Sequence, residues 1–443
     1  METTENSVPA SSGRSFRLLC SPEEAPHVEA LLQAQGYRFE PEPFSPLCRR
    51  LLHEPRPLGA SLAAFFGYIY IQDRSSMLPP LALAPAAGSS VLDICASPGS
   101  KTGFLAQLVG KNGFVLGNEP SRARLATLRA NMHVCNLLSV GTCTCEGQKL
   151  PLRPGSWEAI QLDPPCSGWG TVEKHPRVME LWQGEKVQPL VGLQRLLLRH
   201  AASLLAPGGR LVYSTCTTNA AENEEQVRFA EEELGLERLP LTPFPGFVWE
   251  ELPGGEGTLR VDGRRSAAQG FYVALFRKPY SAVESVAEPL PTRTDARPPR
   301  RGGKSVGRRE QPGQELPREA LAGPCCDPSL LPPGRVMLYG DQARFLPEDA
   351  ARLLPPDMAW QGALLGKFAG GRLHPAPRLR VLLPRRPDAG TALVLDSPDD
   401  LTALLSGQSL RTELEGREAA LWWRDLPLGR VSLKQGRVTA TFS

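Results

Sequence analysis

Three features are missing from this 443-residue sequence, and each absence argues against a class of protein. Its ten cysteines include no Cys-x-x-Cys pair, so a zinc site of that kind is not expected, and they are too few for a disulfide scaffold. No apolar run approaches the roughly 18 residues that a membrane-spanning helix needs, and the polar N-terminus has no apolar signal core. We therefore expect a cytoplasmic protein with reduced thiols and no metal or membrane association.

The length allows two to four domains of about 100–200 residues each, and a hydrophobic fraction of 41% supports real cores. A net charge of only +3 neither requires nor excludes a polyanionic partner. One stretch is rich in Pro, Gly and Arg and has almost no apolar periodicity, which predicts an extended linker. We expect an N-terminal accessory module (1–60), an α/β domain (61–279), the linker (280–327) and a compact β-rich unit (328–443).

Strand-like and helix-like segments alternate between Val91 and Lys278, which predicts a parallel sheet with crossover helices. The turn at Pro207-Gly208-Gly209 is expected to end the longest helix before the next strand. We predict strands at 91–95, 114–118, 139–143, 159–162, 210–214 and 271–276, and helices at 102–109, 122–132, 186–205 and 221–234. Outside this region we predict a helix at 24–35, an extended run at 65–71, and C-terminal strands at 334–340, 362–368, 379–384, 391–397, 419–425 and 429–442.

The stretch VLDICASPGSKT (91–102) is the centre of the predicted α/β domain. An apolar strand stops at a turn of small residues, and a helix starts near Lys101. Such a turn places backbone N–H groups at the carboxyl edge of a sheet, where α/β proteins bind ligands. A ligand with a carboxylate and a nucleoside would suit it, although an ordinary strand-to-helix connection has a similar sequence.

Acidic residues follow the next two predicted strands. Glu119 could accept hydrogen bonds from both ribose hydroxyls of a nucleoside ligand, and Glu146 could contact an adenine edge. Each acid alone is a weak signal, because loop glutamates are commonplace. Their order after one glycine-containing loop strengthens the prediction of a nucleoside site.

Two cysteines stand just past the ends of the fourth and fifth predicted strands. Cys166 follows the rigid Asp163-Pro164-Pro165 turn, and Cys216 follows Ser214-Thr215. Either cysteine alone would more often be a buried structural thiol. The parallel topology places both at one edge of the sheet together with the Asp163 carboxylate.

Two thiols and a carboxylate beside a methyl donor suit methylation of a pyrimidine carbon. A thiolate that adds to C6 of cytosine makes C5 nucleophilic, and a carboxylate at N3 and N4 stabilises the adduct. A second base must remove the C5 proton. Because a free thiol has a pKa of about 8.5, the nucleophile needs nearby positive charge, for which Lys101, Lys174 and the helix after Cys216 are candidates. This chemistry does not decide which of Cys166 and Cys216 attacks.

Four motifs together resemble the Nol/Nop/Sun family of RNA cytosine-C5 methyltransferases: DICASPGSKT, GNEPSRARLATLRAN, DPPCSGWGTVEKHP and LLAPGGRLVYSTCTTNAAENEEQV. The resemblance implies a Rossmann-like fold that uses S-adenosyl-L-methionine. It further implies Cys216 as nucleophile, Cys166 as the thiol that assists proton removal and product release, and Asp163 at the shared base and cofactor site. It places the cofactor against Cys95, Ala96, Ser97, Pro98, Gly99, Ser100 and Lys101, with Glu119 at the ribose and Glu146 near the adenine.

The C-terminal stretch DLPLGRVSLKQGRV resembles the PUA-like RNA-binding domain of RsmF-type 16S ribosomal RNA methyltransferases. This resemblance implies ribosomal RNA or the 30S subunit as partner, an RNA-binding N-terminal module, and a monomer. Phosphate contacts are then expected from Arg424, Arg430, Lys434 and Arg437. There are two departures from the family pattern. Glu146 replaces an aspartate, which bears on the adenine contact, and residues 259–278 lack the histidine and acid of RsmF-type members, which bears on the preference for RNA substrates.

Three other functions fit the sequence less well. The first is an RNA-binding ribosome-assembly factor on a methyltransferase scaffold, against which the intact Asp163, Cys166 and Cys216 argue. The second is a tRNA cytosine-C5 methyltransferase, which shares the catalytic residues. The third is DNA cytosine methylation, which the Thr-Cys motif and the PUA-like tail disfavour.

Overall fold

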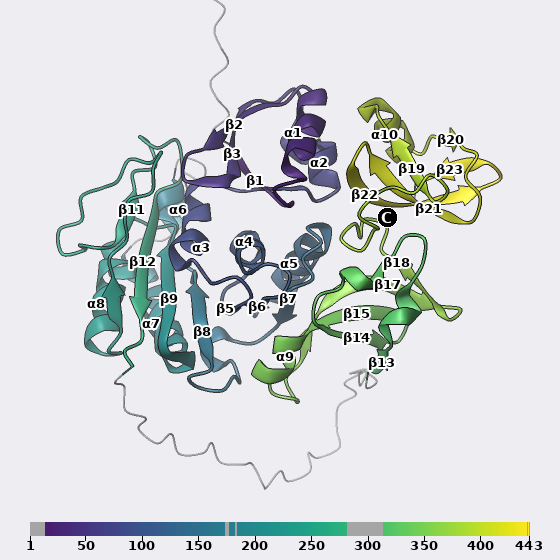
Figure 1. Cartoon of the computed structure of the whole chain (residues 1–443). Coiled ribbons are helices and arrows are strands. Elements are labelled where there is room, and N and C mark those ends of the chain that lie inside the picture. The colour runs from purple at the N-terminus through teal and green to yellow at the C-terminus, as the bar shows by residue number, and fades with distance from the viewer. Residues whose placement is uncertain (1–13, 173–176, 182–183, 281–312, 441, 443) are drawn as a thin grey trace, which may run out of the picture.

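The computed structural model describes residues 14–172, 177–181, 184–280, 313–440 and 442 (Figure 1). Lys174 and most of the predicted linker, at 281–312, lie outside the described residues. Within the described parts, every helix is too short or too polar to cross a lipid bilayer.

The N-terminal unit is a four-stranded sheet of order β2-β3-β1-β4, with two helices. Strand β4 pairs with β1, so this unit extends to Ile71 and not only to residue 60. The predicted extended run at 65–71 is strand only in β4, because the Ser61 side chain accepts the Ala64 N–H and caps a short helix before it. The elements are β1 (Ser15–Leu18), α1 (Ala25–Ala34), β2 (Arg38–Glu42), β3 (Ser45–His53), α2 (Leu62–Phe65) and β4 (Ile69–Ile71).

The central sheet has the order β10-β12-β9-β8-β5-β6-β7-β16, and β11 also pairs with β12. The five neighbouring strands β9, β8, β5, β6 and β7 are parallel, so their carboxyl ends meet at one edge. The strands are β5 (Ser90–Asp93), β6 (Phe114–Asn118), β7 (Val140–Cys143), β8 (Trp157–Leu162), β9 (Leu205–Thr215), β10 (Glu237–Leu239), β11 (Leu259–Val261), β12 (Phe271–Arg277) and β16 (Trp360–Gln361). The helices are α3 (Leu78–Leu83), α4 (Ser100–Val109), α5 (Arg122–Val134), α6 (Val178–Leu181), α7 (Gln188–Leu204) and α8 (Glu224–Glu232).

The predicted α/β fold is confirmed, and all six predicted strands and four predicted helices of this region are present. Adjacent residues of β5 face opposite cores, since Leu92 packs with α7 and α8 while Val91 packs with α3, α4 and α5. Burial on both faces explains why the parallel strands are continuous apolar runs. One detail differs from the prediction: α7 already ends at Leu204, and Pro207-Gly208-Gly209 lies within the irregular start of β9.

The C-terminal region begins at Gln314, earlier than the predicted 328, and contains two five-stranded sheets. The first sheet comprises β13 (Gln314–Leu316), β14 (Gly334–Tyr339), β15 (Gln342–Pro347), β17 (Ala363–Ala369) and β18 (Arg372–Pro375), with α9 (Glu348–Leu353) beside it. The second comprises β19 (Ala392–Leu395), β20 (Leu410–Arg411), β21 (Glu418–Trp423), β22 (Leu426–Lys434) and β23 (Arg437–Thr439), with α10 (Pro398–Leu405).

The predicted strand at 379–384 is wrong, because this apolar segment is a buried turn. The reason lies in Arg380, whose guanidinium is buried and donates to the carbonyls of Phe66 (2.8 Å), Gly67 (2.8 Å) and Leu19 (3.1 Å). The Arg380 N–H donates to the side-chain oxygen of Asn136 in the central domain. The segment therefore joins three parts of the molecule and does not pair as a strand.

The N-terminal unit and the second C-terminal sheet share one hydrophobic core. Phe442 contacts the rings of Phe65 and Phe66 edge-on, with ring centroids 5.6 Å apart in both pairs. The Tyr68 hydroxyl donates to the Pro427 carbonyl. Figure 1 shows these two parts side by side at the top of the view, the N-terminal unit above the central domain and the second C-terminal sheet above the first. The two ends of the folded chain thus stabilise each other.

Candidate active site

Three strand ends are joined by the Asn118 side chain at the carboxyl edge of the central sheet. Its amide nitrogen donates to the carbonyls of Ile94 and Cys145, each at 3.0 Å, and its amide oxygen accepts the Cys145 N–H at 3.0 Å. Because Asn118 is fully buried, these contacts fix the loops after β5, β6 and β7 relative to one another.

The small-residue loop after β5 is held against α5. Asn131 donates to the Pro98 carbonyl at 2.7 Å, and the Ser97 hydroxyl donates to the Arg124 carbonyl at 3.0 Å. Gly99 has a φ of +109°, and a Cβ added there would lie 2.6 Å from Met132 Cε. Only glycine fits this position, and it directs the chain into the N-terminus of α4.

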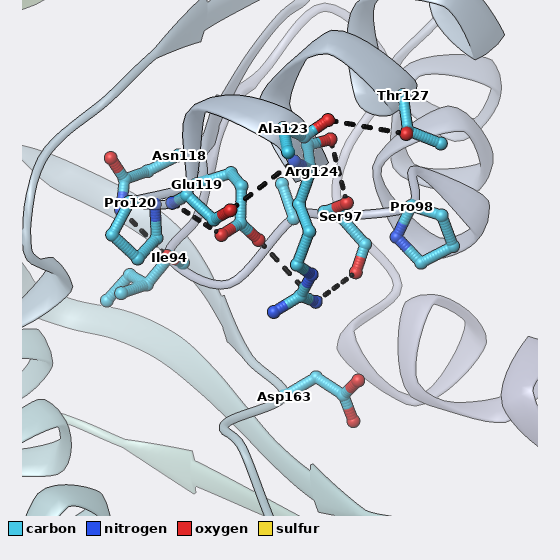
Figure 2. A network of polar contacts seen from close by, with 12 residues as sticks. Ile94, Ser97, Pro98, Asn118, Glu119, Pro120, Ala123, Arg124, Thr127 and Asp163 are labelled. Carbon is cyan, nitrogen blue, oxygen red and sulfur yellow. Dashed lines mark hydrogen bonds and ion pairs between the residues drawn. The ribbon is translucent and has the colours of Figure 1, made fainter.

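Glu119 lies beside this loop, as the sequence predicts. Its side chain is 2% exposed, accepts the Ser121 N–H at 2.9 Å and pairs with Arg124 at 3.5 Å. The same Arg124 guanidinium donates to the Ser97 carbonyl at 3.0 Å, so it bridges the carboxylate and the loop (Figure 2). Sequence reasoning missed Arg124, because an arginine in the first turn of a surface helix carries no distinctive signal.

Glu146 and Cys95 are less clearly part of the site. Glu146 lies at the carboxyl edge, but its side chain is 57% exposed and pairs with Lys149 at 2.7 Å. Cys95 is half-buried and packs against the apolar core, and burial raises the pKa of its thiol well above the usual value. The adenine contact of Glu146 and the cofactor contact of Cys95 stay predictions.

Asp163 is held between two donors. Its Oδ2 lies 2.7 Å from Lys101 Nζ, and its Oδ1 accepts the Ser214 hydroxyl at 2.8 Å. Burial lowers the pKa of Lys101, but attraction and a hydrogen bond to Asp163, together with attraction to Cys216 and Asp93, make the net shift upward. Lys101 is therefore a charged ammonium, and it links the loop after β5 to the loop after β8.

The Sγ atoms of Cys166 and Cys216 lie 3.3 Å apart, which brings the two predicted catalytic thiols together. A hydrogen bond from Cys166 lowers the pKa of Cys216 against the opposing effects of burial and Asp163, and Lys101 assists the lowering. Donation of that hydrogen bond, together with burial, raises the pKa of Cys166 well above its usual value. This arrangement favours a Cys216 thiolate beside a Cys166 thiol.

Cys216 is the one cysteine whose thiol pKa is lowered, and the structure describes all ten cysteines of the chain. The pKa of each of the other nine is raised, chiefly by burial except at Cys166. No local feature of the sequence predicts that the pKa of one thiol is lowered while the pKa values of the others are raised. The difference arises because Lys101 and Cys166 converge on Cys216 from other strand ends.

A buried carboxylate, Glu222, joins the loops that carry the two thiols. It accepts the Ser167 N–H and the Gln194 amide, both at 2.9 Å, and the Asn219 amide at 3.1 Å. The Ser167 hydroxyl also donates to Glu222 and contacts the Thr217 hydroxyl at 2.7 Å. The residue after each cysteine is thus part of one network. The sequence gives Glu222 no distinct role, because nothing in the Glu222-Asn223-Glu224 stretch indicates which of the two glutamates is buried.

The profile of a family described as "16S rRNA methyltransferase RsmB/F" matches residues 80–277. Ribosomal RNA small subunit methyltransferase F of Cronobacter sakazakii is 39% identical over 272 residues, which cover 58% of this chain and 54% of that protein. The protein of the same name from Shewanella amazonensis is 33% identical over 280 residues, covering 59% and 57%. The chain thus spans about half the length of these curated relatives.

Solved structures agree with this likeness. A methyltransferase homolog protein from Pyrococcus horikoshii is 30% identical with a TM-score of 0.52, and the match covers 60% of this chain and 86% of that one. NSun6 from the same organism, at 20% identity and a TM-score of 0.54 over 61% and 92% of the two chains, shares the fold. The chain is thus a methyltransferase homologue, and its residues 80–277 are similar to the RsmB/F family.

Proposed function

We propose that this protein is an S-adenosyl-L-methionine-dependent RNA cytosine-C5 methyltransferase that acts on 16S ribosomal RNA. The observation that carries the proposal is the 3.3 Å separation of Cys166 and Cys216 beside the Lys101–Asp163 ion pair. The choice of 16S ribosomal RNA rests on the names of the relatives. The alternative, an assembly factor without catalysis, gives no reason for two thiols to meet at a charged strand edge.

The residues present fit the cofactor. The loop from Cys95 to Lys101 and the N-terminus of α4 would hold its amino-acid end, and the buried Glu119 carboxylate would accept hydrogen bonds from its ribose. Glu146 would lie near the adenine. When bound, the cofactor supplies an electrophilic methyl group. Glu119 is the stronger candidate of the two acids, because it is buried and aligned by Ser121 and Arg124.

In the proposed mechanism the Cys216 thiolate adds to C6 of cytosine, and a C6–S bond forms. Asp163, aligned by Lys101 and Ser214, hydrogen-bonds to the base at N3 and N4 and stabilises the electron-rich adduct. The cofactor held by the loop from Cys95 to Lys101 would supply the methyl group to C5, and its methyl–sulfur bond would break with the electron pair going to that sulfur. Cys166 first loses its thiol proton to water, since the Cys216 sulfur is then bound to C6 and no longer a thiolate. The Cys166 sulfur accepts the C5 proton, and the electrons of that C–H bond restore the C5–C6 double bond as the C6–S bond breaks. Cys216 leaves as the thiolate with which it started.

Flanking regions complete the proposal. The N-terminal unit and the C-terminal sheets would bind RNA, the latter as the predicted PUA-like domain (328–443). Of the basic residues predicted there, Arg430 is half-buried and pairs with Glu418 at 3.4 Å, while Arg424 stacks on Trp423. A monomer is expected. These assignments rest on the resemblance of the sequence.

Transfer of a labelled methyl group tests the function directly. The protein is incubated with labelled cofactor and with unmodified 16S ribosomal RNA, 30S subunits, tRNA or DNA, and bisulfite sequencing locates any 5-methylcytosine. We expect label in 16S ribosomal RNA or the 30S subunit and none with Cys216→Ala. Preferential labelling of tRNA or DNA would replace the proposed substrate. No transfer to any of the four would contradict the enzymatic function.

A further inference from the structure

The loop at 262–270, which leads into β12, lies at the same edge of the sheet as the two candidate catalytic thiols. Strand β12 is antiparallel to β9, with Tyr272 opposite Thr215, so the start of β12 lies beside the carboxyl end of β9. Cys216 directly follows Thr215. The loop at 262–270 is therefore a neighbour of the candidate nucleophile, although the proposed mechanism gives it no role.

Gly170 connects this loop to both thiol loops through its backbone. The Gly170 N–H donates to the Cys216 carbonyl at 3.0 Å, and the Gly170 carbonyl accepts the Gly270 N–H at 2.9 Å. A Cβ added at Gly170 would lie 2.2 Å from the Gly270 oxygen and 2.9 Å from the Cys216 oxygen. Because no side chain fits there, the loop after Cys166 can contact both other loops only with glycine at this position.

Asp73 holds the end of the loop that lies next to Gly270. It comes shortly after β4 of the N-terminal unit, and its Oδ1 accepts the Gln269 N–H at 3.1 Å across a sequence separation of 196 residues. The same oxygen accepts the N–H of Ser75 at 3.0 Å and its hydroxyl at 2.7 Å, which orients the carboxylate. The backbone that precedes Gly270 is thus fixed from the side of the N-terminal unit.

Arg74 holds the middle of the loop with a buried guanidinium. It donates to the Ser266 carbonyl at 2.7 Å and to the Gly246 carbonyl at 2.9 Å. Its charge is balanced by Glu42, the last residue of β2, at a distance of 2.6 Å, and both side chains are buried. A buried guanidinium that is paired and also donates to carbonyls has a defined position. This ion pair connects the N-terminal sheet to the loop.

The conformation that these contacts hold is a strained one. Ala267 has a φ of +48°, in the left-handed region that residues with a Cβ rarely adopt. The Ser266 hydroxyl next to it accepts the Val248 N–H at 2.9 Å. Strained backbone persists only where surrounding contacts outweigh its cost, and it is concentrated at functional sites. Loss of the contacts from Asp73 or Arg74 would let the loop relax.

We infer that Asp73 and Arg74 are positioning residues: they fix the loop at 262–270, which through Gly170 sets the place of Cys216 in the active site. The inference rests on the proposed function for the role of Cys216 as nucleophile. The N-terminal unit thus takes part in catalysis from a distance, through the residues that follow its last strand.

Two changes at Asp73 test the contact to Gln269. Asp73→Ala removes the acceptor of the Gln269 N–H, whereas Asp73→Asn keeps an oxygen that can accept it. Because Asp73 also accepts the N–H of Ser75, the matched control is Asp327→Ala, which removes an aspartate that accepts the Ser329 N–H at 2.9 Å in the C-terminal region. Both aspartates are only partly buried, so neither change is expected to unfold the protein.

A further variant, Arg74→Lys, tests the contacts to the middle of the loop. Lysine keeps the positive charge opposite Glu42, but its ammonium lacks the planar fork with which Arg74 donates to the Ser266 and Gly246 carbonyls. Circular dichroism and thermal unfolding check that each variant is folded. If Arg74→Lys does not fold, the two Asp73 variants decide the test.

Formation of the Cys166–Cys216 disulfide on treatment with diamide reports the relative place of the two thiols without RNA or cofactor, and mass spectrometry measures its rate. We expect the rate to fall about tenfold in Asp73→Ala and in Arg74→Lys, and to stay at the wild-type value in Asp73→Asn and Asp327→Ala. Methyl transfer should follow the same order, with kcat lowered about tenfold and the KM for the cofactor unchanged.

A disulfide rate in Asp73→Ala equal to that of Asp327→Ala would overturn the inference. Equal loss in Asp73→Asn and Asp73→Ala would also overturn it, because the effect would then follow the charge of the carboxylate and not its hydrogen bond to Gln269. The disulfide assay needs no methyl transfer, so its outcome is separate from that of the proposed function. Slower disulfide formation in an inactive protein would support the positioning roles, and unchanged formation in an active one would contradict them.

Discussion

The backbone N–H of Ser167 donates to the carboxylate of Glu222 at 2.9 Å, across a sequence separation of 55 residues. Ser167 follows one candidate catalytic thiol, and Glu222 lies in the loop that follows the other. Since Glu222 is fully buried and accepts further hydrogen bonds from Gln194 and Asn219, it holds the two loops at a fixed separation. The 3.3 Å contact between the sulfurs depends on this network.

Replacing Glu222 by Gln should separate the thiols without removing either. The amide nitrogen of Gln cannot accept from Ser167 or Asn219, so the loops shift and kcat falls by roughly 10- to 100-fold, with little change in cofactor affinity. Glu225→Gln, an exposed change on the neighbouring helix, is the control. The Glu222→Gln variant should also form the Cys166–Cys216 disulfide more slowly when it is treated with diamide. Mass spectrometry measures the rate of disulfide formation. An unchanged rate would show that Glu222 does not position them.

The two cysteine variants should fail at different steps. Cys166→Ala should form the covalent bond to RNA but release it slowly, because no thiol assists loss of the C5 proton, and a protein–RNA species should persist on a denaturing gel. Cys216→Ala should give neither this species nor product. A trapped species with Cys216→Ala and none with Cys166→Ala would reverse the two roles.

Reactivity of Cys216 with iodoacetamide should depend on Lys101. The thiolate is the reactive form, and the pKa of Cys216 is lowered, so its alkylation should begin at lower pH than that of any other thiol in the chain. Lys101→Gln removes a nearby positive charge and should move the midpoint of alkylation to higher pH, whereas exposed Lys111→Gln should not. Mass spectrometry of peptides over a pH series measures both midpoints. Identical midpoints would exclude Lys101 as the activating charge.

Loss of the Arg380 side chain should loosen the junction of the three parts of the molecule. Arg380→Ala leaves the carbonyls of Leu19, Phe66 and Gly67 without their donor in a buried place, at a cost of roughly 2–5 kcal/mol. Denaturant unfolding and limited proteolysis measure the effect, with exposed Arg385→Ala as the control. Equal stability of the two variants would show that the Arg380 side chain does not stabilise the junction.

The central sheet could be predicted from the sequence because its signals are local. Each parallel strand is a short apolar run that ends at small or polar residues, so Val91 to Asp93 and Phe114 to Asn118 were identifiable without tertiary information. The same reasoning failed at 379–384, where an apolar run is a buried turn. The partners of Arg380 lie more than 300 residues away, in the N-terminal unit, and no local pattern reveals them.

Local sequence patterns are enough to predict the α/β core and the residues at its carboxyl edge, because parallel topology places the ends of successive strands together. Which of these residues contact one another depends on how the chain folds in three dimensions. The lowered pKa of Cys216 and the burial of Glu222, in contrast to Glu224, as the link between the two thiol loops both arise from side chains that are far apart in the chain. Charge, burial and hydrogen bonding depend on distance in space, which the order of residues does not specify.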